Sequence, residues 1–140
     1  MAAKNFLQDS ALLLGRICIS VLFIVAGFEK ILNFSDAVSF ITSQGLPYSN
    51  ILAFIAIILE LGGGIMVLVG WKTRIGGIML LIFAIPAAWV VHSLWSVAPS
   101  TVPNFFQNTL NEVALIGGLL YIIGCGAGSF SFDGRGGQHF

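Results

Sequence analysis

The stretch Ile51–Trp71, ILAFIAIILELGGGIMVLVGW, is an apolar run long enough to cross a bilayer as one helix. Its one ionisable residue, Glu60, lies close to its middle. A charged side chain at the bilayer centre costs at least about 2.5 kcal/mol and is found almost only where it faces a bundle interior or a water-filled cavity. The stretch therefore predicts a transmembrane helix whose carboxylate points into protein.

The helical neighbours of Glu60 agree with that direction. Residues three, four and seven positions away share its face, and they are mostly small: Ala53, Ala56, Gly63, Gly64 and Val67. The opposite face carries bulky apolar side chains: Phe54, Ile58, Leu61, Ile65 and Leu68. Small residues mark seams between membrane helices because they allow the backbones to approach closely. We therefore expect Glu60 to lie in a helix–helix seam.

The composition of the whole chain indicates an integral membrane protein. Of 140 residues, 57% are hydrophobic and only 9% are charged, against about 25% charged residues in soluble domains. The net charge is zero and the six basic residues are scattered, so a nucleic-acid-binding surface is not expected. Cys18 and Cys125 are far apart and form no CxxC motif, so neither a zinc site nor a dithiol centre is predicted.

Four apolar stretches predict an all-α, up-down bundle of four transmembrane helices in a single domain over residues 1–140. Their approximate limits are Ala11–Leu32, Ile51–Val69, Ile75–Trp95 and Leu110–Cys125. The last is short and is expected to begin near Phe105, and a short interfacial helix is expected at Asp36–Ile41. Lys4, Lys72, Arg74 and Arg135 fall on one side of these spans and only Lys30 on the other. The positive-inside rule then predicts that both termini are cytoplasmic.

Each of the other spans carries polar residues at helical spacing. The first has the row Arg16, Ser20, Phe23, Gly27 and Lys30; the third has Gly77, Leu81, Ala84, Ala88 and His92; the fourth has Asn111, Ala114, Gly118, Tyr121 and Cys125, with Glu112 at its flank. Helical side chains lean toward the amino terminus of their own helix. Lys30 and His92 should therefore lean toward Glu60, and Arg16 should lean away from it.

These rows predict a polar cavity that opens to the non-cytoplasmic side. Glu60 would form its floor, and its walls would be formed by Lys30, His92, Asn111 and Glu112. Plainer interpretations stand beside this one. Arg16 and Lys30 can reach the two interfaces by snorkelling, His92 can be an ordinary interfacial residue, and Glu112 can be a first-turn acid that favours a helix N-terminus.

Taken together, the ordered motifs of the chain resemble the DoxX family of small four-span membrane proteins. The matching pieces are Gly15-Arg16, AGFEKI at 26–31, the Gly45-Leu46-Pro47 turn, ILELGGG at 58–64, Thr73-Arg74, His92, ALIGGLL at 114–120 and GAGSFSFD at 126–133. One departure lies ahead of Gly117-Gly118, where the family commonly has Lys-Asn and this chain has Asn111-Glu112. The resemblance implies an inner-membrane protein linked to redox metabolism, since DoxX-like proteins occur in a thiosulfate:quinone oxidoreductase and in a complex with a superoxide dismutase and a sulfurtransferase.

Three functions are compatible with these residues. The first is a membrane subunit of a quinone-linked oxidoreductase, with Trp89, Phe23 and Tyr121 forming the walls of a head-group slot and Glu60 or His92 providing hydrogen bonds. No haem, flavin or CxxC motif is present, so electrons would come from partner redox proteins and the chain alone would not be a complete enzyme. The second is a proton-coupled transporter or exporter of a small molecule. The third is an assembly or anchoring subunit in which the polar network only specifies packing. All three are compatible with a homo-oligomer.

Overall fold

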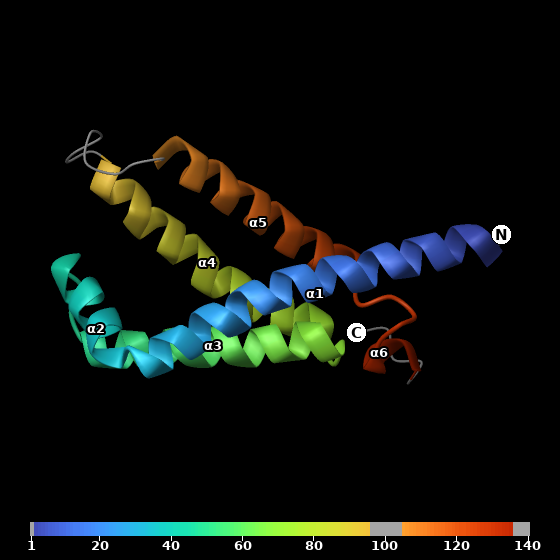
Figure 1. Ribbon diagram of the computed structural model, residues 1–140, viewed down its shortest axis with the longest axis horizontal. Coiled ribbons are helices and arrows are strands. Elements are labelled where there is room, and N and C mark those ends of the chain that lie inside the picture. Colours follow the sequence, from blue (N-terminus) through green and yellow to red (C-terminus); the bar gives the residue numbers. More distant parts are fainter. Residues whose placement is uncertain (1, 96–104, 136–140) are drawn as a thin grey trace.

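The computed structural model describes the backbone of residues 2–95 and 105–135, and the side chains of residues 5–90 and 109–135. All of the described elements are α-helices (Figure 1). In chain order they are α1 (Ala2–Leu32), α2 (Phe34–Ser43), α3 (Ser49–Val69), α4 (Thr73–Trp95), α5 (Phe105–Cys125) and α6 (Phe132–Arg135). The prediction of an all-helical membrane bundle is confirmed, and the short helix predicted at Asp36–Ile41 is present as α2, which extends two residues further at each end.

The four long helices pack mainly between neighbours along the chain. α1 lies beside α3, α3 beside α4 and α4 beside α5, with a smaller contact between α1 and α5 (Figure 1). The amino-terminal end of α1, the turn between α3 and α4, and α6 lie toward one end of the bundle, which we term the clamp end (Figure 1). The first helix begins nine residues earlier than predicted, at Ala2 rather than Ala11, because Lys4 and Asp9 are compatible with a helix that extends beyond the apolar segment.

Three helical segments are long and apolar enough to cross a membrane: Asn5–Leu32, Ser49–Val69 and Thr73–Val90. The apolar segment of α5 within the described side chains, Thr109–Cys125, is shorter. The full α5 has 21 residues, which at 1.5 Å per residue spans about 31 Å, close to the thickness of a bilayer core. Large apolar side chains such as Phe54, Ile58 and Ile82 are about half exposed or more on the outside of the bundle, as lipid contact requires.

The seam between α1 and α3 follows the predicted rows. The buried residues of α3 are Ala53, Ile57, Glu60, Gly63, Gly64 and Val67, and those of α1 include Arg16, Ser20, Phe23 and Gly27. Glycine is needed at the contact: a Cβ on Gly64 would lie 2.9 Å from a side-chain carbon of Ile24. On the other side of α3, a Cβ on Gly63 would lie 3.0 Å from the carbonyl oxygen of Gly76 in α4. Close backbone approach therefore joins α3 to both of its neighbours.

The prediction that one row of α5 faces the bundle interior is wrong for most of that row. Asn111, Ala114, Tyr121 and Cys125 are exposed, and Gly118 is the member that is partly buried. The buried positions are Leu119 and Ile122, with Leu115 and Ile116 packed against the same core. The small partner here is on the facing helix: a Cβ on Gly77 of α4 would lie 2.9 Å from Ile123. Bulky residues of α5 thus pack against Gly77 of α4, whereas Gly118 of α5 lies against α1, where a Cβ would be 2.8 Å from Ile19 Cδ1.

The C-terminal segment folds back over the clamp end. Asp133 accepts hydrogen bonds from the backbone amides of Lys72 and Thr73, at 2.8 and 2.9 Å, and from the Thr73 hydroxyl at 3.0 Å. Its own amide donates to the carbonyl of Gly70. Asp133 therefore caps the amino terminus of α4 from a distant part of the chain. Asp9 of α1 accepts two further bonds from Ser129, which ties α1 to the same segment.

Arg16 lies buried at the centre of these contacts between α1, the end of α3 and the C-terminal segment, which we term the clamp. Its side chain is 1% exposed, so the interpretation that it snorkels to an interface is wrong. The guanidinium donates to the carbonyl of Val67 at 3.2 Å and to the carbonyl of Phe130 at 2.6 Å. The carbonyl of Val67 belongs to the last turn of α3, where carbonyls have no partner within the helix. Arg16 thus satisfies a helix end and holds the C-terminal segment in place.

Candidate functional site

The centre of the candidate site is an ion pair between α1 and α3. Lys30 Nζ lies 3.0 Å from Glu60 Oε1 and donates a hydrogen bond to it. The Glu60 side chain is 2% exposed and the Lys30 side chain 31% exposed. The predicted inward lean of Lys30 toward Glu60 is confirmed, and the pair gives the buried carboxylate a counter-charge at a depth where an isolated charge is costly.

Neighbouring groups fix the position of this pair. Gly27 of α1 sits against Glu60, because a Cβ added there would lie 3.3 Å from Glu60 Cβ and 2.9 Å from Leu61 Cγ. Lys30 Nζ also lies 5.5 Å from the ring centroid of Phe83 in α4, within the range of a cation–π contact. The pair is thus held by contacts from α1, α3 and α4.

Glu60 also borders a cavity that all four long helices share. The cavity has a volume of about 120 Å³ and is lined by Leu22, Phe23, Ala26, Glu60, Phe83, Ala84, Ala87, Glu112, Leu115 and Ile116. The rings of Phe23 and Phe83 meet edge to face, with centroids 6.4 Å apart. The walls are therefore apolar and partly aromatic, and the polar groups among the lining residues are two carboxylates.

Both of these carboxylates keep one oxygen without a partner. Within the described part of the chain, Glu60 Oε2 and Glu112 Oε2 are buried and have no hydrogen-bond partner. A buried acceptor without a partner costs about 1–3 kcal/mol, and more when it is charged. Such atoms in a native fold call for a water, a proton or a ligand. The cavity therefore presents two acceptors for a molecule that can donate hydrogen bonds.

The cavity brings together only some of the predicted site residues. Glu60, Phe23 and Glu112 line it, and Lys30 reaches it through the ion pair. The remaining predicted residues stand elsewhere. Asn111 is exposed, Trp89 and Tyr121 are 77% and 65% exposed on the outside of α4 and α5, and Arg16 belongs to the clamp. His92 lies in α4, but its side chain is outside the described residues.

Phe83 is an aromatic residue of the cavity wall that the sequence patterns did not predict. The row expected to face inward on α4 ran through Leu81, Ala84 and Ala88, whereas the cavity is lined by Phe83, Ala84 and Ala87. The inward face is thus rotated toward the adjacent edge of the helix. The spacing of Leu80, Phe83, Ala84 and Ala87, at three and four residues, could have indicated this alternative face.

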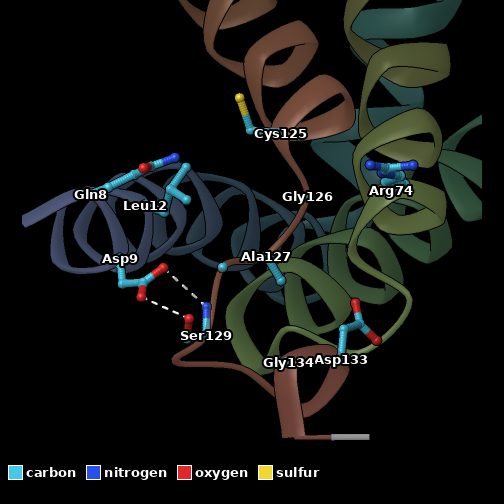
Figure 2. Close-up of a pocket in the computed structure, with 11 residues that line it drawn as sticks. Gln8, Asp9, Leu12, Arg74, Cys125, Gly126, Ala127, Ser129, Asp133 and Gly134 are labelled. Atoms are coloured by element: carbon cyan, nitrogen blue, oxygen red, sulfur yellow. Dashed lines mark hydrogen bonds between the residues drawn. The ribbon is translucent and has the colours of Figure 1, made fainter. Parts of the chain in front are cut away.

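A second, more polar cavity of about 280 Å³ lies at the clamp end (Figure 2). Its walls come from α1, the start of α4 and the C-terminal segment, and include Gln8, Asp9, Arg74, Cys125, Ser129 and Asp133. Figure 2 shows the Asp9 carboxylate turned toward Ser129, with both of its hydrogen bonds to that residue. The carboxylates here already have partners, in contrast to those of the intramembrane cavity. The polar groups of this region therefore serve the fold.

The environment of Asp133 changes its acidity. Burial alone would raise its pKa, but hydrogen bonds from two backbone amides and the Thr73 hydroxyl, together with the charge of Arg16, outweigh that effect and lower the pKa below its ordinary value. The carboxylate is thereby kept ionised as a helix cap. This arrangement was not predicted, because it joins segments about 60 residues apart.

Comparison with known proteins gives a consistent family assignment. A family model described as DoxX matches residues 11–93. The chain is 28% identical to the inner membrane protein YphA of Escherichia coli, over 89% of each chain, and 29% identical to the inner membrane protein YqjF of the same organism, over 91% of this chain and 92% of the relative. It is also 31% identical to 92 residues of the Surfeit locus protein 4 homolog of Schizosaccharomyces pombe, which make up 30% of that protein. No solved structure matches this chain.

Proposed function

This chain belongs to the DoxX family, and we propose that it is the membrane subunit of a quinone-linked redox system, with the head group of the quinone bound at the cavity beside Glu60 and Lys30. The observation that carries the proposal is the Glu60–Lys30 pair, because Glu60 lines an aromatic-walled cavity within the bundle and keeps a second oxygen without a partner among the described residues. We further propose an inner-membrane location with both termini in the cytoplasm, supported by the relatives and by the positions of the basic residues.

The residues fit the chemistry of such a head group. A quinone carbonyl accepts a hydrogen bond, and the hydroxyl of the reduced form donates one. Lys30 is a donor and Glu60 Oε2 is an acceptor without a partner among the described residues, so one site offers contacts to both forms. Phe23 and Phe83 give the flat ring an apolar, aromatic surface. The exposed Trp89 and Tyr121 are not needed for this site.

The reaction would be shared with other proteins. A quinone supplies two-electron, two-proton chemistry within the membrane. The residues of this chain would bind and orient the head group, exclude water, and hold a proton at the Glu60 or Glu112 carboxyl. Electrons would pass to or from a partner redox protein, since the sequence carries no haem, flavin or CxxC motif. The chain is therefore proposed as a subunit, not as a complete enzyme.

Extraction of quinone from the purified protein tests this proposal. The protein is isolated from native membranes, and its bound quinone is quantified per mole of protein beside the Glu60→Gln and Lys30→Met variants. The matched control is Glu29→Gln, which removes an exposed carboxylate one residue from Lys30. We expect quinone to be retained by the native protein and by the control and largely lost from the two site variants. Equal quinone content in all four proteins, or none in the native protein, would overturn the proposal.

A further inference from the structure

The charges that face the intramembrane cavity do not balance. Two carboxylates line it, Glu60 from α3 and Glu112 from α5, while one ammonium, that of Lys30 from α1, reaches it. The other lining residues are apolar, and α4 contributes no charged group from the part of its side chains that the structure describes. Lys30 is already bonded to Glu60 Oε1. Among the described side chains, one positive charge is thus missing from a site that is bordered by apolar walls.

The positions of the unpartnered atoms show where that charge would bind. Glu60 is 2% exposed, and its Oε2 is buried without a hydrogen-bond partner among the described residues. The Oε2 atom of Glu112 is also buried without a hydrogen-bond partner among the described residues, and Glu112 lines the same cavity. An uncompensated buried charge destabilises a protein strongly, whereas a paired and hydrogen-bonded one is tolerated. Both oxygens therefore favour a cation that can also donate hydrogen bonds.

The walls of the cavity select the kind of cation. Calcium and magnesium take six or more oxygen ligands, and the lining side chains offer the oxygens of two carboxylates. The remaining surface consists of aliphatic side chains and the rings of Phe23 and Phe83. Aromatic faces attract ammonium groups, and apolar walls accept a hydrocarbon body. These features suit an organic ammonium better than a metal ion.

We propose that this cavity binds a hydrophobic organic ammonium ion, whose N–H groups donate to Glu60 Oε2 and Glu112 Oε2 while its apolar part contacts the aromatic wall. The proposal goes beyond quinone binding and does not depend on it. It assigns Glu112 a direct role in binding, whereas a quinone head group can be held by Glu60 and Lys30 alone.

Binding of phenethylammonium to the purified protein in nanodiscs tests the site. Equilibrium dialysis with the radiolabelled amine is compared with 2-phenylethanol, a neutral molecule of similar shape. A charge-assisted hydrogen bond contributes about 1.5–3 kcal/mol, which corresponds to about 10- to 100-fold in affinity. We therefore expect Glu112→Gln and Glu60→Gln each to weaken amine binding at least about tenfold, Glu112→Asp to retain part of it, and Glu29→Gln to leave it unchanged.

The Lys30→Met variant separates this proposal from the quinone site. It removes the competing ammonium and should strengthen amine binding, whereas it should weaken quinone binding. Equal binding of amine and alcohol, unchanged amine affinity in a folded Glu112→Gln protein, or no amine binding by the native protein would overturn the ammonium proposal. The last result would indicate that protons alone neutralise the cavity. A native protein that binds the amine but no quinone would instead contradict only the quinone site.

Discussion

Lys30 Nζ and Glu60 Oε1 lie 3.0 Å apart, joining the carboxyl-terminal part of α1 to the middle of α3 with the carboxylate almost fully buried. Glu60 is close to the middle of α3, whereas Lys30 is two residues from the end of α1. The long lysine side chain reaches back along its helix to meet the carboxylate. The geometry explains how a single acid is accommodated in the centre of an apolar helix.

The Lys30→Met variant should lower the stability of the bundle. Removing the ammonium leaves Glu60 as an uncompensated buried charge. Loss of one partner from a fully buried pair costs about 3–5 kcal/mol, and the 31% exposure of Lys30 reduces the expected cost to about 1–3 kcal/mol. Unfolding in mixed detergent with increasing SDS measures it. The double variant Lys30→Met/Glu60→Gln should recover part of the loss, and a double variant less stable than Lys30→Met would contradict the pairing.

Replacing Arg16 by Gln should destabilise the protein by about 2–4 kcal/mol. The guanidinium makes two charge-assisted hydrogen bonds, to Val67 and Phe130, and is 1% exposed. The thermal unfolding midpoint in detergent measures the change. Arg74→Gln is the matched control, because Arg74 is exposed and makes a longer bond of 3.4 Å to Gly124. Similar midpoints for the two variants would contradict the proposed importance of Arg16.

Alanine substitution of two glycines should have opposite effects. Gly70 has φ +76°, and a Cβ there would collide with Arg16 and Ser131, so Gly70→Ala should cost at least about 1–3 kcal/mol. Gly117 lies within α5 and a Cβ there would meet nothing within 4 Å, so Gly117→Ala should be neutral or stabilising by up to about 1 kcal/mol. Detergent unfolding curves of the two variants provide the comparison. Equal stability of both would show that the clamp does not require the left-handed residue.

Asp133 predicts a dependence of stability on pH. The folded protein lowers the pKa of this carboxyl, so at mildly acidic pH the folded state keeps the charge while the unfolded chain takes up a proton. The contribution is complete above the pKa of the unfolded chain, and it disappears as the pH falls through the lower pKa of the folded state. Asp133→Asn should cost about 1 kcal/mol near neutral pH through the weakened cap.

Unfolding of the native protein and of Asp133→Asn between pH 7 and pH 3 measures this effect. The difference between the two proteins should narrow toward the acidic end. A difference that stays constant, or that widens as the pH falls, would contradict the assignment of the cap to the ionised carboxylate.

The sequence was sufficient to predict the parts of the fold that depend on rows of residues at helical spacing. The small residues around Glu60 predicted its inward direction, and the lean of side chains predicted its contact with Lys30. The face of α5 could not be predicted in the same way, because a seam needs a small residue on only one of two helices, and here Gly77 of α4 provides it for Ile123. The spacing of residues within one helix does not reveal which of two packed helices carries the small residue.

The contacts of the clamp could not be predicted from the sequence for a different reason. Arg16 looked like an interfacial side chain because its partners are backbone carbonyls, and any residue provides a carbonyl. The contact between Asp133 and Thr73 joins segments 60 positions apart, with no periodicity to relate them. Such contacts depend on how the chain ends meet in space. The same holds for Phe83, whose role follows from the rotation of α4 in the assembled bundle.

A double-mutant cycle of quinone affinity tests the central claim most directly. The dissociation constant of a short-chain benzoquinone is measured in nanodiscs for the native protein, Glu60→Gln, Lys30→Met and the double variant. If the two residues form one site, each single change should weaken binding at least about tenfold, and the double change should weaken it little more than either single change. Single variants that bind quinone as tightly as the native protein, or losses that simply add, would contradict a head-group site built on the Glu60–Lys30 pair.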